Sequence, residues 1–406
     1  MVFAPKGTTF GGIVARDSRR SGRLEPRNCE SLMVSGLDRR MLRTADVGSC
    51  PVCSSDGSEG VFCSADFLHA VPGEFTYRRC KSCGTVFQDP RVVPNDLALC
   101  YPSGYYTHVA TSETAEAQVG RVTGRRRFGV LRDGLRAGIV STVQRGLHRG
   151  CQSVALAWLA RSRKLRERAF LGVIDELIPR RVPAGRALDI GCGAGFLMRD
   201  LARVGWAVEG FEWDAAAAEV ASRTSRHAVS VGDFRTTALP RSAFDLVVLN
   251  HVFEHLDDPV LALRRIAQIL APGGHAVLIY PNPESVGARL FGVSWVGWDP
   301  PRHLVIPPPR AIRIAALRAG LKVVRTRTLT RDYGGYSYSW GQCQAGRPTS
   351  GGARRIKEKL LGRVSTASFL RKLAVFWRLC GLEMGEEVVV TLAQEGHKMA
   401  SQGYSG

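Results

Sequence analysis

Three glycines at alternate positions, Gly191, Gly193 and Gly195, follow a short apolar segment and precede a stretch of helical composition. A glycine turn between a strand and a helix lets backbone N–H groups approach a ligand closely. Asp189 stands just before the turn, and Glu212 ends the next apolar segment, where an acidic side chain can bind ribose hydroxyls. This spacing predicts a nucleotide-binding corner.

Two CxxC pairs stand near the N-terminal end of the chain, with 26 residues between them. Thiolates in such pairs bind a tetrahedral Zn²⁺ ion and stabilise a module too small for a large core of its own. Four thiolates favour a closed structural centre over a catalytic one. Four ordinary buried or loop cysteines are the alternative, and Cys63 or Cys100 could replace a ligand. The predicted ligands are Cys50, Cys53, Cys80 and Cys83.

A later apolar segment is followed by His251-Val-Phe-Glu254-His255. On a helix, this HxxEH pattern would place two histidines on one face with a glutamate beside them, as in one class of zinc peptidases. After a strand, the same residues indicate the acceptor side of a site, with His251 or His255 as general base and Glu254 near the substrate. A purely structural histidine is the alternative at each position.

The segment Pro300-Pro-Arg-His-Leu304 is a second candidate for the acceptor side. Arg302 could bind a carboxylate or phosphate through two parallel hydrogen bonds. His303 could take a proton from an attacking hydroxyl or amine. The alternative is a rigid proline-rich loop whose arginine caps a helix. The predicted substrate contacts are Glu254 and Arg302, and the catalytic candidates are His251, His255 and His303.

These residues need a scaffold, and from residue 186 onward short apolar segments alternate with helical ones. Such alternation is typical of an α/β fold with a parallel, doubly wound sheet. Helices are predicted over Phe196–Val204, Ala215–Ser222 and Pro259–Leu270, the last ended by a turn at Pro272-Gly-Gly274. Seven strands are predicted, over Ala187–Ile190, Ala207–Phe211, Ala228–Val231, Asp245–Leu249, Ala276–Tyr280, Leu321–Arg327 and Glu387–Leu392.

The segment Leu188–Phe196, LDIGCGAGF, is similar to the first motif of class I S-adenosylmethionine-dependent methyltransferases, and Val208–Trp213 is similar to their second. Gly232–Asp233 resembles their adenine-contacting position, and Phe244–His255 resembles their fourth strand with its following loop. Dehydrogenases usually have GxGxxG spacing instead. The resemblance covers roughly residues 180–330 and the final strand, and it implies a Rossmann-like fold, S-adenosylmethionine as cofactor and methyl transfer as the reaction.

The resemblance also implies where each part of the cofactor would lie. Asp189 would be near its amino-acid end, Glu212 at the ribose and Asp233 at the adenine amino group. Asn250 and His251 would flank the methyl donor. The implied cofactor-binding residues are Asp189, Gly191, Gly193, Gly195, Glu212, Asp233 and Asn250.

The composition divides the chain into a small module and a larger domain. The sequence after the second CxxC pair resembles the zinc-binding N-terminal regions of bacterial methyltransferases, including deoxysugar- and polysaccharide-modifying ones. This resemblance is looser than that of the Rossmann-like part. The predicted parts are a loose tail over 1–46, the zinc-binding module over 47–108, a basic helical linker over 109–180, the Rossmann-like domain over 181–395 with a helical basic insert over 331–385, and a tail over 396–406.

The chain carries a formal net charge of +20, and 48 of its 56 basic residues are arginine. A GC-rich genome can produce such a composition, but the charge is concentrated: Arg121–Arg181 holds 15 basic and 4 acidic residues. An anionic partner is therefore expected, either nucleic acid, a phospholipid surface or a phosphate-bearing substrate. Within the insert, Ser368–Leu379 has basic and apolar residues at helical spacing, as in a helix lying on an anionic membrane, a lid or packed core.

The expected location is the cytoplasm of a bacterium, and peripheral contact to the inner face of the membrane is the alternative to a lid or packed core for the basic insert. The apolar segments are shorter than the ~18 residues that a membrane-spanning helix needs. The N-terminal residues lack the charged-then-apolar arrangement of a secretory signal. The 11 cysteines therefore point to metal binding and not to a disulfide framework.

The function that the sequence favours is methylation of an oxygen, nitrogen or carbon atom of a small molecule, sugar nucleotide or lipid-linked glycan. An RNA methyltransferase is the second hypothesis, since some rRNA enzymes also combine a zinc module with a basic surface. Against it, the aromatic residues do not alternate with the arginines as in a base-stacking platform. A non-catalytic zinc-bearing adaptor is a third hypothesis, and the intact glycine turn with both acids argues against it. The sequence predicts no oligomeric state.

Overall fold

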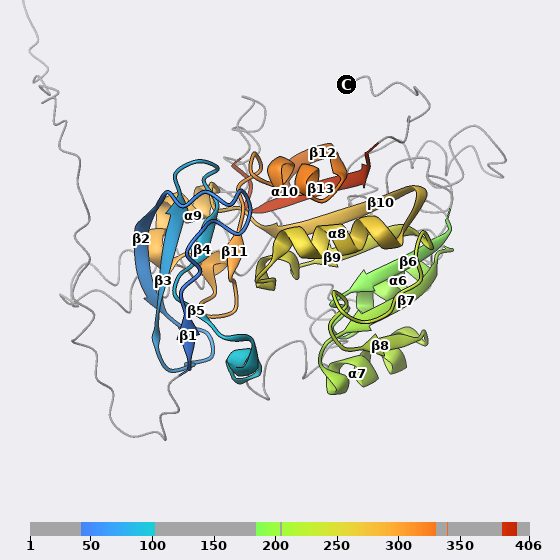
Figure 1. Ribbon diagram of the computed structural model, residues 1–406. Coiled ribbons are helices and arrows are strands. Elements are labelled where there is room, and N and C mark those ends of the chain that lie inside the picture. Colours follow the sequence, from blue (N-terminus) through green and yellow to red (C-terminus); the bar gives the residue numbers. More distant parts are fainter. Residues whose placement is uncertain (1–41, 102–183, 204, 330–338, 340–383, 396–406) are drawn as a thin grey trace, which may run out of the picture. The chain divides into compact units, whose positions relative to one another are not determined.

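The computed structural model describes residues 42–101, 184–203, 205–329, 339 and 384–395 (Figure 1). The predictions for the linker over 109–180, the C-terminal tail and nearly all of the insert, including the membrane-contacting helix, lie outside these residues. Within the predicted N-terminal tail, residues 44 and 45 form a short strand, β1 (Thr44–Ala45), which pairs antiparallel with β5 (Arg91–Val92). The prediction of a loose tail up to residue 46 is therefore wrong at its C-terminal end, because backbone pairing with β5 orders it.

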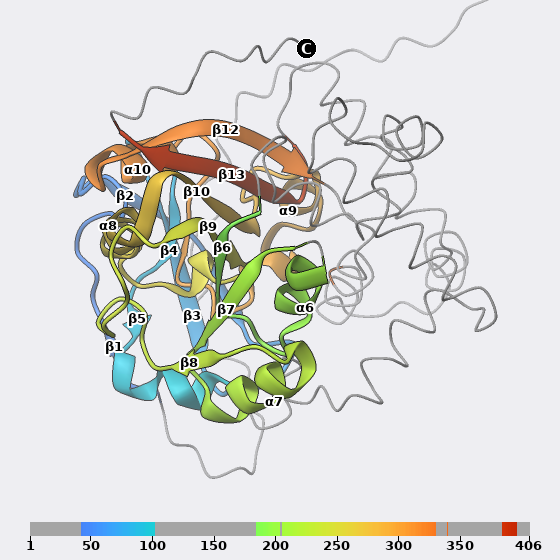
Figure 2. The same ribbon diagram turned by 90° about the vertical axis from the view of Figure 1, so that its right-hand side faces the viewer.

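Seven strands form one sheet in the order β12-β13-β10-β9-β6-β7-β8, which Figure 2 shows from top to bottom. The strands β6 to β10 pair in parallel with their neighbours among one another, and β13 is antiparallel to both β10 and β12. The predicted Rossmann-like, seven-stranded α/β fold is confirmed. The strands are β6 (Arg186–Ile190), β7 (Ala207–Glu212), β8 (Val229–Val231), β9 (Phe244–Asn250), β10 (Leu270–Pro281), β12 (Leu321–Leu329) and β13 (Glu387–Gln394).

Alternate residues of the central strands are buried in two separate cores, one on each face of the sheet. In β9, Val247 and Leu249 belong to one core, while Leu246 and Val248 belong to the other. This division follows from the two-residue period of a strand. The continuous apolar runs that marked the strands in the sequence are therefore those of strands buried on both faces.

Five described α-helices connect or flank these strands, and three of them begin at a side chain that accepts a backbone N–H. Asp214 accepts from Ala217 at 2.7 Å, and Asp258 accepts from Leu261 at 2.8 Å. The helices are α6 (Phe196–Arg203), α7 (Ala215–Ser225), α8 (Pro259–Ile269), α9 (Val286–Phe291) and α10 (Ile312–Arg318). The predicted turn at Pro272-Gly-Gly274 lies inside β10, at a register shift between Leu270 and His275.

The cysteine-bearing module contributes to a four-stranded sheet in the order β11-β4-β3-β2. One edge strand, β11 (Val305–Ile306), comes from the residues that were predicted to belong to the Rossmann-like domain. It pairs antiparallel with β4. The remaining strands are β2 (Ser58–Ala65), β3 (Glu74–Cys80) and β4 (Val86–Gln88), and a 3₁₀ helix, η1 (Pro94–Cys100), follows β5. The small sheet and the large domain thus share backbone hydrogen bonds.

Candidate functional site

The glycine turn lies between the end of β6 and the start of α6, and all three glycines have positive φ angles: 69° at Gly191, 51° at Gly193 and 78° at Gly195. A Cβ atom on Gly191 would lie 2.3 Å from Cγ2 of Val252, and one on Gly195 would lie 2.6 Å from the carbonyl oxygen of Ala221. Glycine is therefore needed at these two positions both for backbone conformation and for close packing.

Glu212 ends β7 and reaches the glycine turn with its carboxylate. Oε2 accepts the backbone N–H of Gly193 at 2.8 Å, and Oε1 accepts that of Trp213 at 2.9 Å. The predicted turn and the predicted acid thus form one hydrogen-bonded corner. A carboxylate oriented in this way can also accept two neighbouring hydroxyl groups of a ribose.

Asp189 is 2% exposed, and its Oδ2 has no hydrogen-bond partner among the described residues. Burial, with a further contribution from the charge of Glu212, raises the pKa of Asp189 to about 8. An unpaired buried carboxyl group is unfavourable for folding. It is the kind of group that a cationic ligand would stabilise.

Asp233 and Asn250 lie after β8 and at the end of β9. The Asp233 carboxylate binds the guanidinium of Arg235, which also contacts Asp257. Burial opposes ionisation of Asp233, but the hydrogen bonds from Arg235 outweigh it and lower its pKa. The predicted adenine contact would therefore share this carboxylate with Arg235. Oδ1 of Asn250 is buried and has no partner among the described residues.

His251 follows β9 with a φ of 57° and lies between two carboxylates. Its Nδ1 is 3.2 Å from Oε1 of Glu254, and its Nε2 is 2.9 Å from Oε1 of Glu387 in β13. Burial favours the neutral ring, but the hydrogen bonds to Glu254 and Glu387 outweigh it and raise the pKa of His251 to about 9. A protonated ring with both nitrogens engaged does not favour the predicted role of His251 as a base. This arrangement instead suits a structural role, in which His251 positions the Glu254 carboxylate.

The peptidase alternative for the HxxEH pattern is wrong for this fold. His251 lies in a bend after β9, and Glu254 and His255 belong to a single-turn 3₁₀ helix, η2 (Phe253–His255). The histidine pair of that peptidase class needs consecutive turns of an α-helix.

Glu254, His255 and His303 form a compact group, in which one ligand atom of each lies within 4.8 Å of those of the other two. Glu254 is fully buried, and its Oε2 has no hydrogen-bond partner among the described residues. Nε2 of His303 is 3.8 Å from Oε1 of Glu254. Burial opposes ionisation of Glu254, but the hydrogen bond from His251 and the nearby histidines outweigh it and lower its pKa. Burial, followed by the charge of His303, lowers the pKa of His255 to about 4.

The loop predicted to present Arg302 to a substrate instead buries it. The Arg302 side chain is 0% exposed and donates to Asp66 at 2.7 and 2.8 Å and to Asp299 at 2.6 and 3.0 Å. It also donates to the carbonyl oxygen of Cys100 at 3.1 Å. The prediction that Arg302 contacts substrate is therefore wrong, because two buried carboxylates occupy the guanidinium. Arg302 fastens the cysteine-bearing module to the domain.

The four predicted zinc ligands lie together, with each sulfur atom within 4.8 Å of the others. The Sγ atoms of Cys50 and Cys83 are 3.6 Å apart, and those of Cys53 and Cys80 are 3.5 Å apart. Thiolates about 2.3 Å from a tetrahedral Zn²⁺ lie roughly 3.8 Å from one another, so the cluster fits such an ion. Cys63 and Cys100 are not in this group.

Three residues near the site were not identified from the sequence. Asp66 binds Arg302, Glu387 binds His251, and the Tyr101 hydroxyl lies 2.9 Å from Nδ1 of His255. Only Glu387 had a recognisable signal, since it is an acidic residue at the start of the last predicted strand. Asp66 and Tyr101 come from the module, and no local pattern relates them to residues 255–303.

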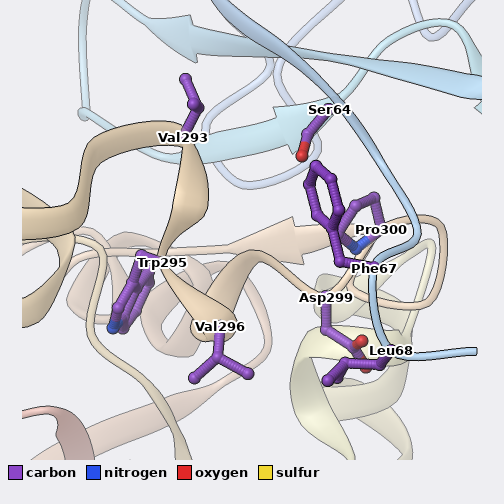
Figure 3. A pocket seen from close by; sticks show the side chains of 8 residues that line it. All are labelled: Ser64, Phe67, Leu68, Val293, Trp295, Val296, Asp299 and Pro300. Atoms are coloured by element: carbon purple, nitrogen blue, oxygen red, sulfur yellow. The ribbon is translucent and has the colours of Figure 1, made fainter. Parts of the chain in front are cut away.

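A small hollow opens beside Asp299. Figure 3 shows that two segments line it, Ser64–Leu68 from the module and residues 293–300 from the domain. The exposed aromatic ring of Phe67 and the side chains of Leu68, Val293 and Val296 give it an apolar wall. Because Asp299 also lies 3.8 Å from Nε2 of His303, this hollow approaches the histidine group.

The chain is similar to known proteins over the part that contains the large sheet. A family model described as a methyltransferase domain matches residues 162–326. An uncharacterized methyltransferase from Mycobacterium tuberculosis is 30% identical over 154 residues, which are 34% of this chain and 78% of that protein. The chain belongs to the class I S-adenosylmethionine-dependent methyltransferases. The ubiquinone biosynthesis O-methyltransferase of Marinobacter nauticus is 32% identical to this methyltransferase over 136 residues, 31% of this chain and 56% of that protein.

This methyltransferase spans about half the length of the ubiquinone biosynthesis enzymes that it matches. Among solved structures, a TehB-like S-adenosylmethionine-dependent methyltransferase from Corynebacterium glutamicum is 20% identical, with a TM-score of 0.32 over 56% of this chain and 87% of that one.

Proposed function

We propose that this methyltransferase transfers a methyl group from S-adenosylmethionine to an oxygen, nitrogen or carbon atom of a small molecule, sugar nucleotide or lipid-linked glycan. The observation that carries the proposal is the adjacency of two sites. β6 and β9 are parallel neighbours, so the glycine turn and the histidine segment begin side by side at the same edge of the sheet. Val252, in the histidine segment, packs directly on Gly191.

The cofactor side of this edge offers three features that suit S-adenosylmethionine. Glu212 can bind the ribose hydroxyls while it holds Gly193, and Oδ2 of Asp189, which has no hydrogen-bond partner in the part of the chain that the structure describes, can pair with the cationic amino-acid end. Oδ1 of Asn250, at the end of β9, likewise has no partner within that part. The bound cofactor supplies an electrophilic methyl group, so the protein has to align the acceptor and exclude water.

The acceptor side is formed by Glu254, His255 and His303. The His303 ring is oriented by a nearby backbone group, since its Nδ1 lies 2.8 Å from the carbonyl oxygen of Gly297. That carbonyl can only accept a hydrogen bond, so Nδ1 is the donor. Imidazole and carboxylate groups gathered in this way suit an acceptor that must lose a proton. The O-methyltransferase relatives, named for ubiquinone biosynthesis, support a hydroxyl group as the acceptor.

The cofactor assignment predicts that Glu212→Gln weakens the binding of S-adenosylmethionine about 10- to 100-fold, since a hydrogen bond to a charged group contributes about 1.5–3 kcal/mol. Isothermal titration calorimetry measures this change. Glu209→Gln is the matched control, because Glu209 lies on the same strand but makes an exposed ion pair with Arg186. Equal affinity in both variants would contradict the assignment.

The acceptor class is tested by transfer from radiolabelled S-adenosylmethionine to fractionated small-molecule extracts and, separately, to total RNA. We expect label in the small-molecule or glycan fraction. Label in RNA alone would replace this proposal with the RNA methyltransferase hypothesis.

We also propose that Cys50, Cys53, Cys80 and Cys83 hold a structural zinc ion. The geometry of the four sulfur atoms supports this, and the buried Cys50, Cys80 and Cys83 belong to the same apolar core as α8 and α10. Replacing Cys50 and Cys53 together by serine should remove zinc from this cluster and lower the melting temperature by several degrees, because metal binding contributes directly to folding. Elemental analysis and thermal unfolding measure the two effects. Cys63→Ser is the control, and a double variant that keeps this zinc would contradict the ligand set.

A further inference from the structure

We propose that Glu254, His255 and His303 bind a second metal ion, a divalent transition metal, separate from the cysteine cluster. Their ligand atoms gather within 4.8 Å of one another. Two imidazole nitrogens and one carboxylate oxygen are a common ligand set for zinc, iron and related ions. The metal site rests on these residues alone, and its role toward the acceptor rests on the proposed function.

The separation between two of the ligand atoms is near the one that such an ion requires. Ligands at about 2.0–2.1 Å from a tetrahedral ion lie roughly 3.4 Å apart. Nε2 of His303 and Oε1 of Glu254 are 3.8 Å apart.

Both histidines are oriented by groups outside the proposed metal site, as metal-binding histidines usually are, with one ring nitrogen facing a backbone carbonyl. Nδ1 of His303 is 2.8 Å from the carbonyl oxygen of Gly297, and Nδ1 of His255 is 3.1 Å from that of Arg302. At His303 the carbonyl oxygen can only accept, so Nδ1 is the donor and Nε2 is the nitrogen that can bind a cation. Nδ1 of His255 also lies 2.9 Å from the Tyr101 hydroxyl, so both polar groups orient this ring.

The surroundings of the Glu254 carboxylate also favour the binding of a cation. Glu254 is fully buried, and Oε1 is within hydrogen-bond distance of His251, while Oε2 has no hydrogen-bond partner among the described residues. His251 is in turn held by Glu387 from β13. An unsatisfied buried carboxylate oxygen is unfavourable for folding unless a ligand occupies it, and a metal ion would remove that penalty.

The protein supplies three ligands here, in contrast to the four of the cysteine cluster. A site with three protein ligands keeps a position for an exogenous oxygen, whereas four thiolates close a structural centre. The ligand expected at the open position is a hydroxyl or carboxylate oxygen of the acceptor. The cation would thereby orient the acceptor at the edge of the sheet where the cofactor corner lies.

The test is a Co²⁺ titration of the full chain whose cysteine cluster already holds zinc, without cofactor or acceptor. We expect one equivalent of Co²⁺ to bind and to give visible ligand-field absorption without the intense near-ultraviolet band of cobalt thiolates. Glu254→Gln and His303→Gln should each weaken this binding at least tenfold. His227→Gln, at a half-buried histidine after α7, should leave it unchanged.

The fold of each variant is checked by its binding of S-adenosylmethionine, which does not use these side chains. Retained cofactor binding with lost Co²⁺ binding supports the site. Failure of the wild-type chain to bind Co²⁺, a thiolate spectrum, or unchanged affinity in both variants would overturn it. If Co²⁺ binds but no methyl transfer occurs, the proposed function fails while the metal site stands.

Discussion

Replacing Arg302 by methionine is expected to lower the free energy of unfolding by about 3–5 kcal/mol, the usual effect of removing one partner of a buried ion pair. The substitution leaves the carboxylates of Asp66 and Asp299 without their cation. The Asp66 side chain is 1% exposed and that of Asp299 is 10% exposed, so water cannot replace the guanidinium. Urea denaturation measures the change.

Arg186→Met is the matched control for Arg302→Met. Arg186 pairs with Glu209 at 2.7 Å, a distance like that between Arg302 and Asp66, but its side chain is 47% exposed. Exposed pairs contribute about 0–1 kcal/mol. Combining Arg302→Met with Asp66→Asn and Asp299→Asn should recover part of the loss, because the uncompensated charges are then removed. If Arg302→Met and Arg186→Met destabilise the protein equally, the buried network does not fasten the module.

Asp189→Asn is expected to weaken the binding of S-adenosylmethionine about 10- to 100-fold at pH 8 and, at the same pH, to stabilise the cofactor-free protein by about 1–3 kcal/mol. Both effects have one cause, a buried carboxyl group with an unpaired Oδ2. The carboxylate attracts the cationic end of the cofactor, but without cofactor its charge is unfavourable. Asparagine keeps the shape and removes the charge.

The pH dependence of Asp189 follows from its pKa, which burial raises from an ordinary value of 3.8 to about 8. Because the folded-state pKa is the higher one, its contribution to stability is fully present below about pH 4 and is lost as the pH rises to 8. Cofactor affinity should change in the opposite direction and increase toward pH 8, as the carboxylate ionises. Calorimetry and thermal unfolding from pH 6 to 9 measure both trends.

Asp200→Asn is the control for the Asp189 experiments. Asp200 lies on α6, and its carboxylate binds Arg199 and Arg203, so its replacement should change neither cofactor affinity nor its dependence on pH. If Asp189→Asn leaves cofactor affinity and its pH dependence as in the wild type, Asp189 does not contact the cofactor.

The sequence alone determined the elements that depend on local pattern. Apolar runs of strand length marked the strands β6, β9, β10 and β13, because these strands are largely buried on both faces and leave little room for polar residues. The glycine spacing marked the turn after β6, since only glycine tolerates the positive φ and the close approach of Val252 and Ala221. The two CxxC pairs marked the cysteine cluster, because each pair forms a local turn.

Only the tertiary structure decided which polar side chains meet. Asp66 and Arg302 are 236 residues apart in the chain, and His251 and Glu387 are 136 apart. The sequence showed the types of these residues but not their partners, and it assigned Arg302 to a substrate and His251 to proton transfer. The burial of a charge and the identity of its counter-charge depend on how distant segments pack. For that reason, the roles of Arg302, His251 and the Glu254–His255–His303 group were decided by the fold and not by any local motif.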